Sequence, residues 1–261
     1  MAVVTGAGGG LGAAYARALA RAGARVVLLD LDGAAAQARA AEIVASGGHA
    51  WSAACDVTDE AQCRAAIAAA VAREGGVDLL INNAGISHRS AFADTTAAVY
   101  RRVMDVNFFG ALHCTQAALP SLRERRGLVV AISSIAGFAP LYGRTGYSAA
   151  KHALHGLFES LRCELDESGV EVLIVCPGFT ATGIGAAALD GAGQRTRHPQ
   201  STVGRVAQPD EVAEAVLRAV RRHRRLLVLT AAGKASWLLS RLSPSLYARL
   251  MTRGLRRELQ R

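Results

Sequence analysis

Short apolar runs alternate with helical patterns along almost the whole chain. The runs are uniformly apolar, which is typical of parallel strands whose two faces are both covered by helices. We expect seven strands, at residues 2–5, 25–29, 49–54, 77–81, 128–133, 170–175 and 226–230. Helical periodicity predicts helices near residues 10–22, 33–46, 59–74, 97–125, 147–167 and 209–222. This order predicts an α/β fold built on one doubly wound parallel sheet.

The 261 residues are enough for one large α/β domain, and no linker divides the chain. We expect a single domain over residues 1–233, followed by an extension over 234–261. Residues 178–208 form a long irregular stretch rich in Gly, Thr and Ala. Loops of this length in compact domains are often lids, so we interpret 178–208 as a substrate-loop region.

Composition and the start of the sequence indicate a cellular compartment. Apolar residues make up 51% of the chain, and the five cysteines are dispersed without C-x-x-C spacing, so we expect free thiols in a reducing compartment. "MAVVTG" runs straight into the first strand without a signal-peptide pattern, and no run reaches the roughly 18 apolar residues of a membrane span. We therefore expect a cytoplasmic protein.

The net charge of +9 is unevenly distributed along the chain. Residues 195–261 hold 15 Lys and Arg against 4 Asp and Glu, whereas residues 1–194 hold 15 against 17. A nucleic-acid-binding domain typically shows a basic face across the whole domain with aromatic or recognition-helix features, which this sequence lacks. We expect no nucleic-acid partner, and the basic extension needs its own explanation.

The extension is both basic and amphipathic. Leucines recur at Leu242, Leu246 and Leu250, and arginines form another stripe at Arg249, Arg253 and Arg257. One interpretation is a helix that packs on the domain or on a neighbouring subunit, with its arginines in solvent. The other is a weak peripheral contact with an anionic membrane surface.

A glycine-rich motif, "VVTGAGGGLG" at residues 3–12, follows the first predicted strand and opens the first helix. In this context Gly6 permits the tight turn, while Gly10 and Gly12 allow close backbone approach. The N-terminus of the helix would then face a pyrophosphate. The arrangement is typical of a Rossmann-type dinucleotide site.

Asp30 ends the second strand, eighteen residues after Gly12. A carboxylate at this place can accept both hydroxyls of an adenosine ribose and would repel a 2′-phosphate. Neither Leu31 nor Gly9 offers a basic side chain for such a phosphate. The pattern predicts NAD rather than NADP, although Asp30 could also be a simple turn or N-cap residue.

Two further strand ends carry polar residues. Asp56 ends the third strand and could bind the adenine amine, with Val57 giving a backbone contact; capping of the next helix suits Thr58 or Asp59 better. "NNAG" at residues 82–85 ends the fourth strand, at the carboxyl edge where such sheets bind ligands.

Tyr147 and Lys151 lie four residues apart on a predicted helix, so the phenol and the ammonium would share one face. An isolated pair of this kind is usually a surface pair. Here "TGAGGGLG", "NNAG", "DVNFFG", "ISSIAG", "YSAAK" and "PGFTAT" follow one another over residues 2–182. In order and spacing they resemble the short-chain dehydrogenase/reductase family, most closely its carbonyl and hydroxysteroid reductase-like branch.

The resemblance implies four catalytic residues. Tyr147 would be the general acid/base, although a free phenol with a pKa of about 10 is a poor base at neutral pH. Lys151 and the oxidised nicotinamide would lower that pKa, typically by roughly 1–3 pH units, and Lys151 would also hold the nicotinamide ribose. Ser134 would orient the substrate oxygen, and Asn107 would anchor a water that relays protons. Alternatively, Ser134 or Ser133 satisfies backbone at a strand end, and Asn107 breaks a helix.

The resemblance also places Thr180 and Thr182 near the nicotinamide carboxamide, with Thr182 the firmer assignment. Motif and resemblance together give these cofactor contacts: Gly6, Gly8, Gly9, Gly10, Leu11, Gly12, Asp30, Leu31, Asp56, Val57, Asn83, Ala84, Gly85, Tyr147, Lys151, Pro177, Gly178, Thr180 and Thr182. Four further residues flank the motifs and are candidates for the pocket lining: His88, Phe138, Tyr142 and Phe179. The spacing of potential ligands predicts no metal site.

These observations predict an NAD-dependent oxidoreductase that interconverts a secondary alcohol and a ketone, on an apolar or cyclic, steroid-like small-molecule substrate. One alternative is a 3-oxoacyl thioester reductase, whose acidic carrier would meet the basic extension. Another is a dinucleotide-sensing protein without turnover. The resemblance further implies a homodimer or homotetramer formed through the helices at 97–125 and 147–167.

Overall fold

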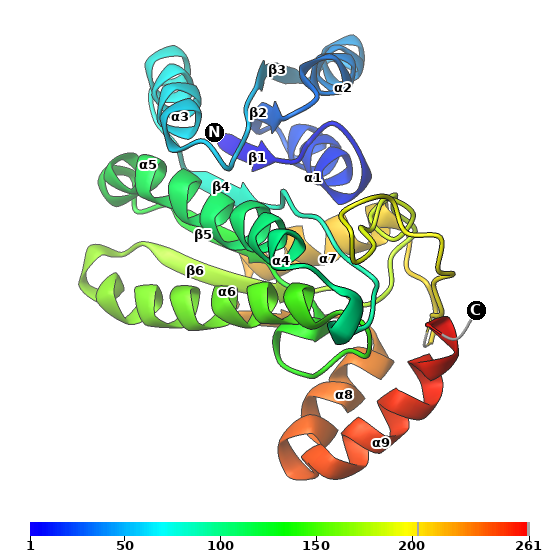
Figure 1. Ribbon diagram of the computed structural model, residues 1–261. Helices are drawn as coiled ribbons and strands as arrows, with labels where there is room; N and C mark the ends of the chain where they lie inside the picture. The colour runs from blue at the N-terminus through cyan, green and yellow to red at the C-terminus, as the bar shows by residue number, and fades with distance from the viewer. Residues whose placement is uncertain (203, 260–261) are drawn as a thin grey trace.

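The computed structural model describes residues 1–202 and 204–259, without the side chain of Arg257 from the arginine stripe. Within them, seven parallel strands form one sheet in the order β3-β2-β1-β4-β5-β6-β7 (Figure 1). The strands are β1 (Ala2–Thr5), β2 (Arg25–Asp30), β3 (His49–Ala54), β4 (Leu79–Asn82), β5 (Leu128–Ile132), β6 (Glu171–Cys176) and β7 (Leu226–Val228). The predicted doubly wound α/β sheet is confirmed.

Helices connect the strands and cover both faces of the sheet (Figure 1). They are α1 (Gly10–Arg21), α2 (Gly33–Ala45), α3 (Glu60–Glu74), α4 (Ala97–Met104), α5 (Gly110–Arg125), α6 (Thr145–Glu164), α7 (Pro209–Arg221), α8 (Ala231–Leu242) and α9 (Pro244–Leu255).

The uniformly apolar strands supply two separate cores. Side chains of successive strand residues point to opposite faces of a sheet. Val4 and Leu28 accordingly join the core under α1, α2 and α7. Val3 and Leu29 join the core under α3, α5 and α6. This double burial explains why the strands lack an alternating polar pattern.

The order of the strands reverses at β1, which pairs with β2 on one side and with β4 on the other. All neighbouring strands are parallel, so their carboxyl ends meet at one edge of the sheet. The crevice outside such a reversal is where open α/β sheets bind ligands.

The helix predicted over 97–125 is interrupted. α4 ends at Met104, residues Asp105–Phe109 form a π-helical turn, and α5 begins at Gly110. Asn107 lies in this turn, and its amide nitrogen donates to the carbonyl oxygens of Val103 and Ile86, both at 2.8 Å. The sequence pattern of an α-helix does not reveal such a widened turn.

The seventh strand is also shorter than predicted. It ends at Val228 because Thr230 adopts a left-handed conformation, with φ of 65°, and accepts a hydrogen bond from the Gly233 amide as the N-cap of α8. The extension predicted from residue 234 therefore begins as a helix at Ala231.

α8 and α9 form what we call the C-terminal helix pair, which lies beside the carboxyl edge of the sheet (Figure 1). Tyr247 and Leu255 of α9 are buried against the domain. Four leucines remain exposed: Leu238, Leu242, Leu246 and Leu250. One face of the helix pair thus packs on the domain, as the first interpretation of the extension required, while an apolar ridge stays in solvent.

Candidate functional site

A cavity of about 1060 Å³ runs along the carboxyl edge of the sheet, from the glycine-rich turn to the C-terminal helix pair. Its walls come from the ends of β2, β4, β5 and β6, from α6, from the 178–208 loop and from α8 and α9. Elements that are far apart in the sequence therefore meet at one site.

The glycine-rich turn is built so that the backbone itself forms one end of the cavity. Gly6 has φ of +63°, and a Cβ atom there would lie 2.8 Å from the Cα of Ala84. A Cβ atom on Gly12 would lie 2.0 Å from the carbonyl oxygen of Gly6. Gly12 therefore permits close packing of α1 on the turn without itself lining the cavity.

α1 begins beside this cavity, and no side chain caps its first amide groups. Its N-cap is Gly9, which supplies no side-chain hydrogen bond, and its first turn contains no acidic residue. Free N–H groups and the positive end of the helix dipole favour an anion such as a pyrophosphate. A Cβ atom on Gly10 would lie 3.5 Å from the Cβ of Thr182. The side chain of Thr182 therefore covers this end of the helix.

Asp30 lies at the mouth of the cavity beside the exposed Leu31. Its two carboxylate oxygens accept from the amides of Gly8, at 2.7 Å, and Asp32, at 2.9 Å. Asp32 rather than Asp30 caps α2. Each Asp30 oxygen can accept a further hydrogen bond, so the carboxylate both holds the turn and remains suited to two ribose hydroxyls.

The predicted adenine contacts also line the cavity. Asp56 accepts from the amide and the hydroxyl of Thr58, at 2.9 and 2.8 Å, while Asp59 caps α3 as the sequence suggested. The amide nitrogen of Asn83 donates to the carbonyl oxygens of Thr5 and Gly6. Asn83 thus ties the end of β4 to the glycine-rich turn.

Ser134, Tyr147 and Lys151 meet on the cavity wall where β5 and α6 come together. The Lys151 ammonium lies 5.7 Å from the centre of the Tyr147 ring and donates to the carbonyl oxygen of Ile132 at 2.8 Å. The buried Ser133 hydroxyl donates to the Lys151 carbonyl at 3.4 Å. Ser133 therefore serves the backbone of α6, and the Ser134 hydroxyl, which accepts from the Ala136 amide, is the one at the wall.

Burial acts on both titratable groups of this helix. It lowers the pKa of Lys151 to about 7. It also raises the pKa of Tyr147, while the neighbouring Ser134 hydroxyl and the Arg144 charge act in the opposite direction. In the protein alone burial therefore raises the Tyr147 pKa, the lowering expected from Lys151 is not found, and the cation that partly offsets burial is Arg144.

Asn107 holds a buried oxygen that is free for a further partner. Its amide nitrogen is used by backbone carbonyls, but its Oδ1 has no hydrogen-bond partner among the described residues. A Cβ atom on Gly85 would lie 2.7 Å from this Oδ1 and 3.6 Å from the Lys151 Nζ. Both polar atoms therefore lie close to the backbone of Gly85.

The substrate side of the cavity is mainly apolar. Its lining includes Phe179, Ile184, Leu239, Tyr247, Leu250, Met251 and Leu255. Most of these residues belong to the C-terminal helix pair, which the sequence did not connect with the site. Pro177, Gly178 and Thr180 complete this side, with the Thr180 hydroxyl donating to the Gly178 carbonyl.

Of the four flanking residues, Phe179 lines the cavity and the others do not. Phe138 packs edge-on against His155 within the core. His88 is fully buried and accepts a hydrogen bond from the Gly146 amide at 2.8 Å. Tyr142 is held by its backbone, whose amide donates to the Met251 sulfur at 3.0 Å. These three positions act behind the cavity wall.

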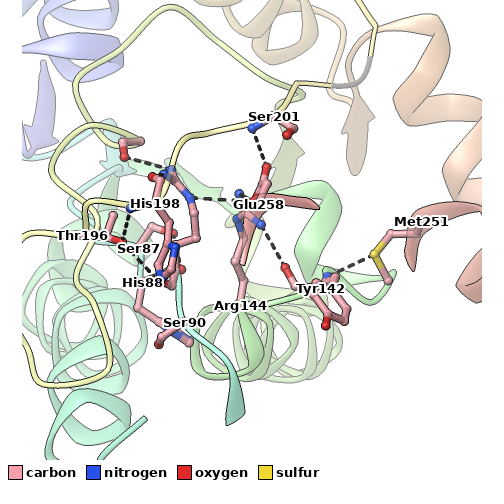
Figure 2. A network of polar contacts seen from close by, with 12 residues as sticks. Ser87, His88, Ser90, Tyr142, Arg144, Thr196, His198, Ser201, Met251 and Glu258 are labelled. Carbon is pink, nitrogen blue, oxygen red and sulfur yellow. Dashed lines mark hydrogen bonds and ion pairs between the residues drawn. The ribbon is translucent and has the colours of Figure 1, made fainter. Parts of the chain in front are cut away.

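Sequence reasoning missed three buried charged residues beside the cavity: Arg89, Arg144 and Glu258. Figure 2 shows Arg144 and Glu258. Arg89 and Arg144 line the cavity, and both pair with the Glu258 carboxylate. A local signal existed for the arginines, because Arg89 follows the "NNAG" motif and Arg144 precedes Tyr147 by three residues. The sequence held no comparable signal for Glu258.

Comparison with known proteins identifies the family. A family model described as short chain dehydrogenase matches residues 1–193. The chain belongs to the short-chain dehydrogenase/reductase family. It is accordingly an oxidoreductase, and a nicotinamide dinucleotide is the cofactor class of its family.

Relatives of this dehydrogenase match it over nearly its whole length. Dehydrogenase/reductase SDR family member 7B of Bos taurus is 38% identical over 264 residues, covering 98% of this chain and 81% of the relative. "Probable oxidoreductase EphD" of Mycobacterium bovis is 37% identical over 255 residues, covering 92% of this chain and 43% of that protein.

Solved structures of other dehydrogenases share the fold. A short-chain dehydrogenase/reductase of Burkholderia phymatum in complex with NAD superimposes with a TM-score of 0.84 at 27% identity, covering 94% of each chain. An alcohol dehydrogenase of Thermococcus sibiricus complexed with 5-hydroxy-NADP gives a TM-score of 0.76 at 25% identity, covering 87% of this chain and 94% of that one.

Proposed function

We propose that this dehydrogenase uses NAD to interconvert a secondary alcohol and a ketone, on an apolar or cyclic, steroid-like substrate. The observation that carries the proposal is the convergence of Ser134, Tyr147 and Lys151 on the wall of a cavity whose other end carries Asp30. Membership of the family supports this class of reaction. The four residues support this cavity as the place where it would occur.

The chain offers a place for each part of the dinucleotide. The amides at the start of α1 would hold the pyrophosphate, and the Asp30 carboxylate would accept from the adenosine ribose hydroxyls. Lys151 would hold the nicotinamide ribose. The nicotinamide, when bound, accepts a hydride from an alcohol carbon or supplies one to a carbonyl carbon.

The protein's own groups handle the proton. In the oxidative direction the Tyr147 oxygen takes the hydroxyl proton of the alcohol while the C–H bond gives up its electron pair as hydride. The Ser134 hydroxyl donates to the substrate oxygen and fixes its orientation. Lys151 and the free Oδ1 of Asn107 border the route by which the proton would leave through water.

Asp30 supports NAD as the cofactor. Its carboxylate would repel the 2′-phosphate of NADP, and the neighbouring Leu31 offers no positive charge. The similarity to the Burkholderia phymatum protein in complex with NAD points the same way. The apolar side chains of α8, α9 and Phe179 support an apolar substrate.

The test is a spectrophotometric assay of the purified protein with NAD and four alcohols: 2-propanol, 2-decanol, cyclohexanol and a 3-hydroxysteroid. We expect reduced nicotinamide to form with the larger alcohols. Tight binding of NAD with no turnover would instead support the dinucleotide-sensing alternative. Reduction of a 3-oxoacyl thioester with NADPH, without alcohol oxidation, would support the acyl reductase.

A further inference from the structure

The Glu258 carboxylate lies in a buried cluster with two arginines, Arg89 and Arg144. Figure 2 shows Glu258 beside Arg144. Its Oε2 is 2.7 Å from Nη2 of Arg144 and 3.9 Å from Nε of Arg89. All three residues are at most 5% exposed. Two guanidinium groups therefore share one carboxylate inside the protein, and removing that carboxylate would leave two buried positive charges unpaired.

The cluster joins four segments of the chain that surround the substrate side of the cavity. Glu258 also accepts from the Ser201 amide of the 178–208 loop at 2.5 Å. Arg89, from the segment after β4, donates to the carbonyl oxygens of Gly185 and His198 in the same loop. Arg144, at the start of α6, donates to the Tyr142 carbonyl at 2.9 Å.

Further contacts hold α9 against the segment that leads into α6. Besides the bond from the Tyr142 amide to the Met251 sulfur, the Tyr247 hydroxyl donates to the Pro140 carbonyl at 3.3 Å. Tyr247, Met251 and Leu255 line the cavity. The place of this wall relative to Tyr147 thus depends on how residues 140–144 and Glu258 are joined.

Arg144 links the cluster to the chemistry. It is the N-cap of α6, three residues before Tyr147, and its charge partly offsets the effect of burial on the phenol. The Glu258 carboxylate is the ion-pair partner of this guanidinium. An ion pair on the surface would contribute little to stability. A buried ion pair holds its groups in one geometry, because no water competes for them.

We propose that Glu258 is a positioning residue of this dehydrogenase: its carboxylate orients Arg144 and Arg89 and so holds α9 as the wall of the substrate pocket beside Tyr147. The role rests on the proposed function. It makes the C-terminal helix pair part of the site that selects the substrate, with long or cyclic apolar alcohols depending on it most.

The test compares Glu258→Gln with Glu258→Asp, which keeps the charge but is one methylene shorter. The matched control is Glu214→Gln, because Glu214 pairs with Arg21 at 3.0 Å on an exposed surface away from the cavity. For each protein we would measure thermal unfolding, NAD affinity, kcat and KM for 2-propanol and 2-decanol, and amide hydrogen exchange at Tyr142 and Ser201.

We expect Glu258→Gln to raise the KM for 2-decanol by about tenfold, with smaller changes in kcat and in NAD affinity, because a misplaced wall weakens positioning of the substrate. Exchange at Ser201 and Tyr142 should accelerate. Glu258→Asp should restore part of the KM, and Glu214→Gln should behave like the wild type.

Unchanged KM and unchanged exchange in Glu258→Gln would overturn the proposal. So would a loss of NAD affinity as large as the change in KM, since that pattern indicates general destabilisation. If Glu258→Gln does not fold, the same comparison is made with Glu258→Asp. A wild-type protein that oxidises none of the alcohols contradicts the proposed function, whereas the exchange measurement still decides whether Glu258 holds the wall.

Discussion

Burial moves the pKa values of Tyr147 and Lys151 in opposite directions. The phenol is stabilised in its protonated form and the amine in its neutral form, because each loses solvation of its charge. Lys151, with a pKa of about 7, can therefore release and regain a proton near neutral pH. This behaviour suits a group that passes protons between Tyr147 and water.

Replacing Tyr147 with phenylalanine removes one oxygen atom and little volume. We expect the rate of alcohol oxidation to fall by about 10²–10⁴-fold, the usual contribution of a positioned acid or base, with NAD binding retained. Steady-state kinetics and cofactor titration give both quantities. The control is Tyr100→Phe. The Tyr100 hydroxyl lies 2.6 Å from the Thr145 hydroxyl, and Tyr100 does not line the cavity. Equal activity of the two variants would contradict the role of Tyr147.

Asp30→Asn removes the negative charge at the adenosine end of the cavity. We expect the ratio of kcat/KM for NAD to that for NADP to fall by about tenfold or more, which corresponds to ~1.4 kcal/mol. The neighbouring Asp32→Asn is the control, because Asp32 caps α2 by accepting from the Ala35 amide and does not line the cavity. A cofactor preference that Asp30→Asn leaves unchanged would exclude Asp30 as its source.

At the scale of an element, α6 depends on a histidine from another segment. The first amides of a helix lack partners within the helix. In α6 the Gly146 amide, next to Tyr147, donates to the Nε2 of His88. Burial, with the Arg144 charge, lowers the pKa of His88 to about 4. The neutral imidazole is therefore the form that supports the start of α6.

This arrangement predicts an acid-sensitive helix. The ordinary pKa of histidine is about 6.5, so between about 4 and 6.5 the unfolded chain binds more protons at this site than the folded chain. The His88 contribution to stability is present above this window and is lost as the pH falls through it. We expect the free energy of unfolding to fall more between pH 7 and pH 5 in the wild type than in His88→Gln.

Urea denaturation at the two pH values measures the difference. His152→Gln provides the control, since His152 is an exposed residue of the same helix and bonds only to the local Ser148 carbonyl among the described residues. It should keep the wild-type pH dependence. Identical slopes for wild type and His88→Gln would show that the imidazole is not the responsive group.

Local patterns predicted most elements but missed features that depend on distant partners. The buried strands are visible as apolar runs, and β1 and β3 have the predicted bounds. The π-helical turn is set by where the Asn107 amide finds carbonyl partners, including Ile86 of another segment. No local pattern carries that information.

The same distinction holds for the site. Glycines, Asp30 and the Tyr147–Lys151 spacing form short motifs because one turn or one helix positions them. The pairing of Arg144 with Glu258 joins residues separated by more than a hundred positions, and either residue alone looks like a surface charge. Such pairs become visible only when the sheet edge and the C-terminal helix pair are brought together.

At the scale of the whole molecule, charge and apolar exposure gather on the C-terminal helix pair. Residues 231–257 contain no Asp or Glu, and the exposed leucines of α8 and α9 lie beside arginines such as Arg241 and Arg249. Within the described residues, no helix has both the length and the apolar character to cross a bilayer. Leu250 both lines the cavity and is exposed, so the ridge continues into the site.

This surface predicts a weak, salt-dependent contact with anionic membranes. We expect part of the protein to float with phosphatidylserine vesicles at low salt and to remain at the bottom with neutral vesicles or at high salt. Leu242→Glu should reduce flotation, whereas Val44→Glu, at an exposed position on α2, should not. Protein that stays at the bottom with anionic vesicles at low salt contradicts the prediction.

Two other expectations stay predictions: a cytoplasmic location and assembly into a homodimer or homotetramer through α4, α5 and α6. The exposed Phe109 lies in the π-helical turn between α4 and α5. Light scattering of the purified protein measures the assembly directly.

The widened turn at Asp105–Phe109 also bears on how this chain tolerates changes in length. A turn of this kind holds one residue more than the ordinary helical path needs. Deleting a single residue there would let α4 and α5 continue as one regular helix, with the side chains on both sides of the deletion keeping their faces. Asn107 would lose its hydrogen bonds to the carbonyl oxygens of Val103 and Ile86. The fold would therefore tolerate the deletion, whereas the proposed reaction would not.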